Sequence, residues 1–163
     1  MESPEPAPPA SRRPFRVAPG GDALAEREAG FWTLGGRLSW VAGLVLALSS
    51  LMGWYVGEQA AGGIHIAVLG WHTGTLGKLV FFLGLAVVAL AALREAGIQL
   101  PASVPESLVV VALGSLATIF VLIRLISIPD EFFFAGRGVG IWIALAAALA
   151  TIAAGLLLAG EEL

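Results

Sequence analysis

The chain has 163 residues, of which 58% are hydrophobic and 13% are charged, and its formal net charge at neutral pH is -3. A mean hydropathy of +0.89 exceeds what a soluble domain of this size usually carries, which predicts a membrane protein. The acidic balance excludes a basic nucleic-acid-binding surface, and the absence of cysteine excludes disulfides, thiolate metal sites and cysteine nucleophiles.

Residues 1–21 are dominated by proline, alanine, glutamate and arginine, as in "ESPEPAPPASRRP". Such a segment cannot bury enough apolar surface to offset the entropy of ordering, so we predict a disordered, proline-rich cytoplasmic tail. Residues 22–37 contain "DALAEREA", which Asp22 would cap, followed by the aromatic residues Phe31 and Trp32. This order predicts a juxtamembrane interfacial helix at the level of the lipid headgroups.

Four apolar runs follow, and each has about the length needed to cross the hydrocarbon core of a bilayer. They cover residues 38–56, 76–93, 108–128 and 139–158. Each run is apolar on all sides, whereas a surface helix of a soluble protein keeps a polar stripe. The connections after the second and third runs are short, so these spans pack as antiparallel neighbours. We predict an all-α membrane protein, a four-transmembrane-helix up-and-down bundle over residues 38–158, with a short cytoplasmic C-terminus at 159–163.

The connection between the first two runs contains "GGIHIAVLGWHTG", in which Ile64, Ile66 and Val68 alternate with other residues. A period of two is typical of a β-strand. We therefore predict a short extracytoplasmic loop or hairpin between helices 1 and 2.

Small residues spaced by four occur in two runs: Ser49, Gly53 and Gly57 in the first, and Ala147, Thr151, Gly155 and Ala159 in the fourth. Such stripes allow helix backbones to approach closely. The approach is either within one chain or between protomers, and the sequence leaves both open.

The basic residues beside the spans predict the orientation. One side holds Arg12, Arg13, Arg16, Arg27, Arg37 and Arg94, and the other holds Lys78, Arg124 and Arg137. The larger set predicts a multi-pass protein of the cell membrane with cytoplasmic N- and C-termini, although the two sides nearly balance without the tail arginines. Trp40 at the inner edge of the first run, and Trp54 and Tyr55 at its outer edge, fit aromatic belts at the two interfaces.

His65, His72 and Glu58 are side chains of the chemical kind that binds zinc. Their spacing puts the two histidines on opposite faces of a continuous strand, and they would converge only if the chain turned near Gly70. We predict no metal site and no cofactor, and interpret both histidines as solvated or hydrogen-bonded loop residues.

Ionisable residues gather at the predicted outer mouth of the bundle. This polar cluster comprises Glu58, Lys78, Arg124, Asp130, Glu131 and Arg137. Lys78 and Arg124 lie near the ends of spans, where they either extend to water along their own stems or pair with an outer carboxylate. In the second case the planar guanidinium of Arg124 would bind an anionic headgroup or solute.

No phosphate loop, nucleophile elbow, zinc-protease helix or pair of intramembrane carboxylates occurs in the chain, so we predict no catalytic residues. The main functional hypothesis is a non-enzymatic structural, accessory or regulatory subunit of a membrane complex. Its partners would be the lipid bilayer and other membrane proteins or further copies of the chain. A component of a small-solute or lipid transport system is the alternative, followed by a membrane-embedded enzyme acting on a lipid.

Three motifs carry a resemblance to a known group: "LMGWY" closes the first run, "RLISIP" closes the third, and "GRGVGIWIALAAALA" opens the fourth. The chain resembles small four-helix integral membrane proteins of unassigned function from high-GC Gram-positive bacteria over residues 38–158. The matching positions are Trp54, Tyr55, Arg124, Pro129, Arg137 and Gly140. The resemblance implies a four-helix fold and assigns no role to these residues.

Overall fold

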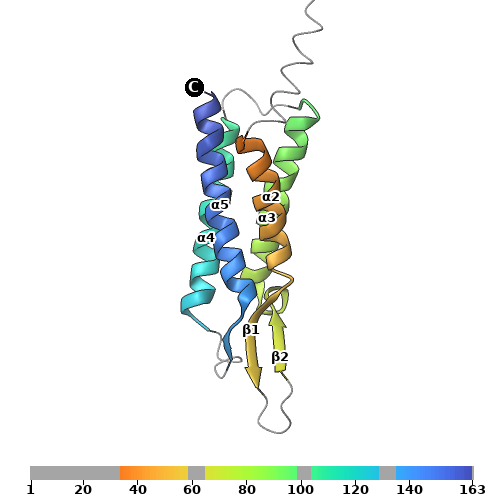
Figure 1. Cartoon of the computed structure of the whole chain (residues 1–163), viewed down its shortest axis with the longest axis vertical. Helices are drawn as coiled ribbons and strands as arrows, with labels where there is room; N and C mark the ends of the chain where they lie inside the picture. The colour runs from red at the N-terminus through yellow and green to blue at the C-terminus, as the bar shows by residue number, and fades with distance from the viewer. Residues whose placement is uncertain (1–33, 59–64, 99–103, 129–134, 163) are drawn as a thin grey trace, which may run out of the picture.

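The computed structural model describes residues 34–58, 65–98, 104–128 and 135–162. Within them are four α-helices and a three-stranded sheet (Figure 1). The helices are α2 (Leu34–Ser49), α3 (Thr75–Glu95), α4 (Glu106–Ile126) and α5 (Val139–Glu162). The strands are β1 (Gly53–Glu58), β2 (His65–Leu69) and β3 (Gly136–Arg137), and a 3-10 turn, η1 (Gly70–His72), follows β2. We name the end that carries the sheet the strand end, and the opposite end, where α2 begins and α5 finishes, the terminal end.

Helices α3, α4 and α5 are long and apolar enough to cross a membrane, whereas α2 is a shorter apolar helix of 16 residues. Large apolar side chains are exposed on every helix, among them Leu48, Phe82, Ile119 and Leu156. Apolar surface of this extent is stable against lipid chains and unfavourable in water. The mostly helical chain is therefore compatible with a multi-pass membrane protein, as its composition predicts.

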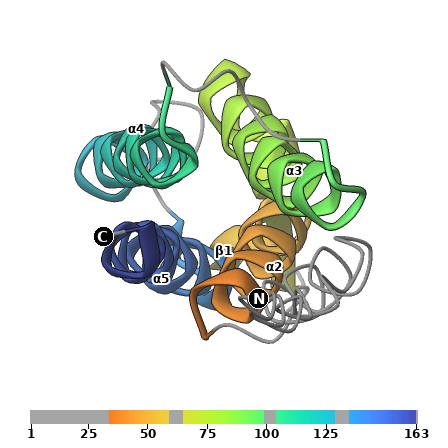
Figure 2. The same cartoon turned by 90° about the horizontal axis from the view of Figure 1, so that it is seen from above.

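Seen along its long axis, the bundle places the helices in the order α4, α5, α2, α3 (Figure 2). Neighbouring helices run antiparallel: Gly35 at the start of α2 lies against Leu158 near the end of α5, and Met52 beyond α2 lies against Gly140 near the start of α5. Helices α3 and α4 contact each other less than the other neighbouring pairs do. The four helices therefore form a ring that is least tightly packed between α3 and α4.

Glycines set the closest approaches between helices. A Cβ atom on Gly84 of α3 would lie 2.5 Å from the Ala47 nitrogen and 2.8 Å from the Gly43 oxygen, both in the backbone of α2. A Cβ atom on Gly155 of α5 would lie 2.8 Å from the Val111 nitrogen of α4. These contacts are with backbone atoms that cannot rotate away, so any larger residue would separate the helices.

The stripe predicted in the fourth run is confirmed as packing within the chain, because Ala147, Thr151 and Gly155 are buried and Gly155 contacts α4. The stripe predicted in the first run is wrong. Gly53 and Gly57 lie in strand β1, where a spacing of four does not define a helix face.

The prediction that the first apolar run forms one helix to residue 56 is wrong, because α2 ends at Ser49. The Trp54 indole donates to the Ser49 carbonyl at 2.8 Å, and the Gly70 amide donates to the Met52 carbonyl at 3.0 Å. The first bond satisfies a carbonyl at the end of α2, and the second binds the segment beyond the helix to the residue that follows β2. The chain can therefore stop its helix inside an apolar run and continue as β1.

The strand predicted from the alternation near Ile66 is confirmed as β2, and its partner is β1. The sheet is antiparallel in the order β2-β1-β3. The prediction that Trp54 and Tyr55 belong to an interfacial aromatic belt is wrong, because both side chains are fully buried at 0% exposure. They belong to the apolar core with Leu46 and Val121, so they attach the sheet to the helices.

The remaining boundaries differ from the prediction at the helix ends. Residues 34–37, assigned to the interfacial helix, form the first turn of α2, and residues 159–162, assigned to a C-terminal tail, continue α5. Helix α4 ends at Ile126 and not at residue 128. The predicted tail (1–21) and the rest of the interfacial helix (22–33) lie outside the described residues.

Candidate functional site

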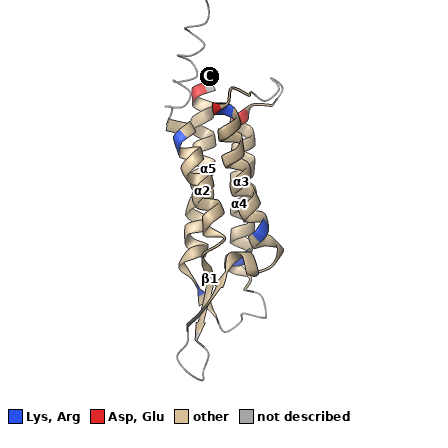
Figure 3. Cartoon of the chain, turned by 90° about the vertical axis from the view of Figure 1, so that its right-hand side faces the viewer, with Lys and Arg blue, Asp and Glu red and all other residues tan. Residues whose placement is uncertain are grey.

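The charged residues of the described segments gather at the two ends of the bundle, with uncharged helix between them (Figure 3). Glu95, Glu106, Glu161, Glu162, Arg37 and Arg94 belong to the terminal end, and Lys78, Arg124, Arg137 and Glu58 belong to the strand end. Any function that depends on the described charged residues is therefore confined to the two ends of the bundle.

At the strand end, Tyr55 joins β1 to both Arg124 and Arg137. Its hydroxyl donates to the Arg124 carbonyl at 2.7 Å, and its backbone is the register partner of Arg137 across β1 and β3. Arg137 Nε donates to the carbonyl of Leu125, the residue after Arg124, at 2.8 Å. Two guanidinium-bearing residues are thus tied to the last turn of α4.

The Arg124 side chain lies against the N-terminal end of α3. Its Nη2 atom would be 2.7 Å from a Cβ on Gly74, the N-cap residue of α3, which has a φ of 104°. The position favours glycine both through this positive φ and through the space that the guanidinium occupies. The Nε atom is buried, and no acceptor bonds to it within the described segments.

Burial raises the pKa of the Tyr55 phenol above its usual value, and the charges of Arg124 and Arg137 partly oppose this by lowering it. The neutral phenol is the form that can donate to the Arg124 carbonyl.

Lys78 does not join this group in the contacts that the structure describes. Its ammonium lies 5.7 Å from the ring centroid of Trp71, a cation-π contact. Trp71 packs edge to face on Phe81, with ring centroids 5.2 Å apart, and Phe82 is 5.6 Å from Phe81. This half-exposed aromatic group on η1 and α3 is of the kind that settles at a membrane interface.

The predicted outer cluster is therefore only partly assembled. Tyr55 bonds to the Arg124 carbonyl and pairs with Arg137 across the sheet, whereas Lys78 contacts Trp71. The register pairs Glu58 with His65 at the far end of β1 and β2. Asp130 and Glu131 lie outside the described residues.

The chain turns at Gly70, which is the condition under which the two histidines could converge. The turn comes after β2, however, so the length of that strand separates them. His65 begins β2, and His72 ends η1 beyond the opposite end of that strand. Within the described segments, no three histidine, aspartate or glutamate side chains gather as a metal would require. Glu58 and His65 remain neighbours in register only.

The sequence analysis missed a network at the terminal end. Arg94 at the end of α3 lies 3.9 Å from Glu106 at the start of α4 and 3.9 Å from Glu161 near the end of α5. Glu161 also accepts a hydrogen bond of 3.2 Å from the Gly35 amide in the first turn of α2. All four helices are thus joined through Arg94 and Glu161.

This network was accessible from the sequence, because Arg94 and Glu106 flank one short connection between antiparallel runs. A glutamate is favourable at a helix start and an arginine at a helix end, so both residues also suit the helix dipoles. Glu161 is at the unfavourable end of its own helix, but it faces the favourable end of α2.

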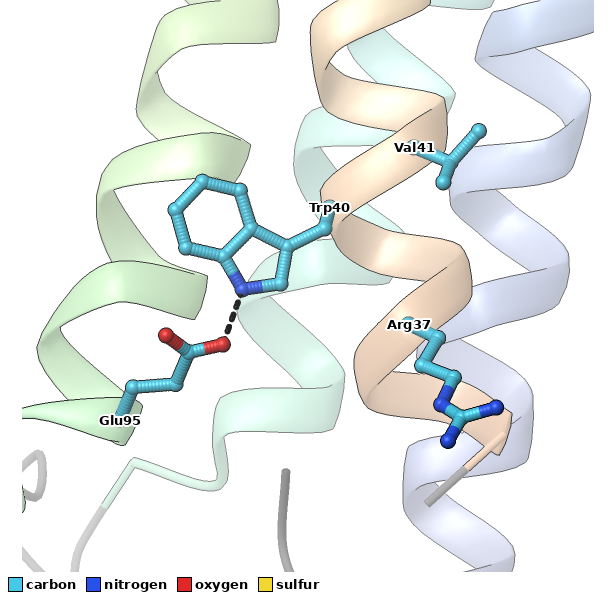
Figure 4. A pocket seen from close by; sticks show the side chains of 4 residues that line it. All are labelled: Arg37, Trp40, Val41 and Glu95. Carbon is cyan, nitrogen blue, oxygen red and sulfur yellow. Dashed lines mark hydrogen bonds between the residues drawn. The ribbon is translucent and has the colours of Figure 1, made fainter. Parts of the chain in front are cut away.

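A shallow hollow of about 420 Å³ lies beside this network, lined by Arg37, Trp40, Val41 and Glu95 (Figure 4). The Trp40 indole donates to Glu95 at 2.5 Å and so closes one side of the hollow. Most of its wall is the ring of Trp40 and the side chain of Val41, with one charged group at either side (Figure 4).

Hydroxyl groups within the bundle are directed at their own helices. Ser39, Ser49, Ser50, Thr118 and Thr151 each donate to a backbone carbonyl three or four residues earlier. These hydroxyls are therefore engaged in backbone hydrogen bonds.

Comparison of the chain with protein-family models, with curated proteins and with solved structures finds no match.

Proposed function

We propose that the chain is a four-span integral membrane protein that acts through its surfaces, as a structural, accessory or regulatory subunit of a membrane complex. The observation that carries the proposal is the contrast between a small-residue interior and wide apolar outer faces on α3 and α4. Only 28% of the spanning window of α3 and 22% of that of α4 are buried, against 44% for α5.

The first span is the one that needs argument, because a helix of 16 residues is only about 24 Å long. The segment from Gly35 to Met52, however, runs beside α5 from Leu158 to Gly140. That stretch of α5 rises by about 27 Å, close to the thickness of a bilayer core. Helix α2 with its following turn therefore supports a fourth crossing, and the exposed Leu51 and Met52 suit the lipid at that turn.

The polar groups support action through surfaces rather than through an internal reaction site. The hydroxyls described above bond to their own helices, and the described charges lie at the two ends. A polar route for a solute would need unpaired polar groups at mid-depth. Protein or lipid contacts on the outer faces of α3 and α4 are the function that this distribution favours.

A photo-crosslinking amino acid placed at selected positions tests the proposal in intact membranes. Ile119 of α4 is 52% exposed, and Ala117 on the same helix is fully buried. We expect a crosslink at Ile119, but not at Ala117, to one protein that also copurifies with the unmodified chain in mild detergent. Crosslinks to lipid alone at every outward position would contradict the subunit proposal, and solute leakage from liposomes of the purified chain would favour transport.

The proposed orientation, with both termini cytoplasmic, is tested by single introduced cysteines, because the native chain has none. We expect a membrane-impermeant thiol reagent to label A61C and F133C in intact cells. E2C and A102C should react only after the membrane is opened. Labelling of E2C in intact cells would reverse the orientation.

A further inference from the structure

Arg124 and Arg137 are both connected to Tyr55 at the strand end. Tyr55 donates to the Arg124 carbonyl, and Arg137 Nε donates to the neighbouring Leu125 carbonyl. Because Tyr55 is also paired with Arg137 across the sheet, the three residues are held by backbone hydrogen bonds on three elements. The Arg137 side chain and the backbone of Arg124 are thereby held at the same turn at the end of α4.

The guanidinium of Arg124 has donors left over. Its Nε is buried without an acceptor in the part of the chain that the structure describes, and leaving a buried charged donor unpaired is unfavourable. An arginine carries five N–H donors. The Nε atom is enclosed, but Arg124 as a whole is only partly buried, so a group with several acceptor oxygens would bind its other N–H donors.

The surroundings of Arg124 add to the need for negative charge. Its Nη2 lies against Gly74, the N-cap of the 21-residue helix α3. No side chain caps this helix start, and its first turn contains no acidic residue. Arg124 lies in the last turn of α4, which favours its charge, but the start of α3 carries partial positive charge and disfavours it. An anion bound beside the guanidinium would remove the repulsion from α3.

We propose that Arg124 and Arg137 form a binding site for a phosphate group, with Tyr55 holding the two arginines in place. The guanidinium plane matches a phosphate through two parallel hydrogen bonds, which a lysine cannot provide. The site lies at the end of apolar helices, where a bilayer presents its headgroups, so its phosphate comes from an anionic lipid headgroup or from free phosphate. The proposal does not depend on the chain being a subunit of a complex.

Thermal unfolding of the full chain in an uncharged detergent tests the site, because a ligand that binds the folded form raises the midpoint temperature. The probes are dihexanoyl phosphatidylglycerol, sodium phosphate and dihexanoyl phosphatidylcholine at equal ionic strength. We expect the first probe to stabilise the protein more than the zwitterionic third. If sodium phosphate stabilises the protein as much as phosphatidylglycerol does, free phosphate is the ligand. If sodium phosphate has no effect and phosphatidylglycerol stabilises the protein, the lipid headgroup is the ligand.

Variants locate the binding. Arg124→Gln should weaken the binding of the anion at least tenfold, because a charge-assisted, two-pronged contact is lost. Arg124→Lys should fall between, since it keeps the charge without the planar fork. Lys78→Gln is the matched control, because Lys78 is basic and lies at the same end but contacts Trp71. If Arg124→Gln does not fold, Arg137→Gln gives the same test from an exposed position.

The proposal is overturned if neither phosphatidylglycerol nor phosphate raises the midpoint temperature of the wild-type chain more than sodium chloride does at the same ionic strength. Arg124 would then be neutralised within the protein. It is equally overturned if Lys78→Gln weakens binding as much as the arginine variants do, which would indicate general attraction to basic surface. Neither result bears on the crosslinking at Ile119, so the two proposals fail separately.

Discussion

Replacing Gly84 with alanine tests whether the spacing of α2 and α3 is set by backbone contact. The added methyl group would lie 2.5 Å from the Ala47 nitrogen and 2.8 Å from the Gly43 oxygen. Both atoms belong to the backbone of α2, so the two helices must move apart by several tenths of an ångström or more. Overpacking of this kind costs about 1–3 kcal/mol, against about 1 kcal/mol gained when alanine replaces glycine within a helix.

Gly160 of α5 supplies the matched control, because a Cβ atom there meets nothing within 4 Å. We expect Gly160→Ala to leave the free energy of unfolding in detergent unchanged or slightly raised. Gly84→Ala should lower it relative to that control by about 1–3 kcal/mol, the overpacking cost alone. The assay is a reversible denaturant titration followed by circular dichroism. Equal stability of the two variants would refute the reasoning, because it would mean that α2 and α3 adapt freely at this contact.

Three further predictions concern the ends of the bundle. Tyr55→Phe should lower the free energy of unfolding by about 0.5–1.5 kcal/mol, measured by the same titration, because it removes the hydrogen bond to the Arg124 carbonyl. Since the folded protein raises the pKa of Tyr55 above 10.0, the wild type should keep this stabilisation below pH 10 and lose it as pH rises through the higher folded value; Tyr55→Phe should remove that alkaline loss from a pH series. Arg94→Gln should lower stability by about 1 kcal/mol at most, and less at high salt, because its ion pairs of 3.9 Å are partly exposed; a loss that salt leaves unchanged would contradict this account.

Hydropathy predicts the helices of this chain well and the end of the first one poorly. Runs two to four appear as α3, α4 and α5 with boundaries shifted by a few residues, since nothing within them competes with the helix. In the first run, hydropathy cannot distinguish an apolar helix from a buried strand. The decisive contacts are the donations from Trp54 to Ser49 and from Gly70 to Met52, and Gly70 lies outside that run.

The candidate site shows the same division between local and distant information. The sequence singled out Lys78 and Arg124 because charge within a span is costly, and it placed Arg137 with them in the polar cluster at the outer mouth. It could not connect Tyr55 to the two arginines, because that depends on the pairing of β1 with β3 across about 80 residues of chain. The same limit hid Glu161, whose partner Gly35 is 126 positions away.

The two ends of the bundle differ in how their charges are satisfied, and this difference favours the strand end as the place of ligand binding. At the terminal end, Arg94 lies between two carboxylates, and Glu161 also faces a helix start. At the strand end, the described cations face an aromatic ring, backbone carbonyls and a second helix start. A carbonyl accepts a hydrogen bond but does not neutralise a charge as a carboxylate does, so the described contacts at the strand end leave a place for a bound anion. An anion supplied by the membrane or the solvent is the simplest completion of that end.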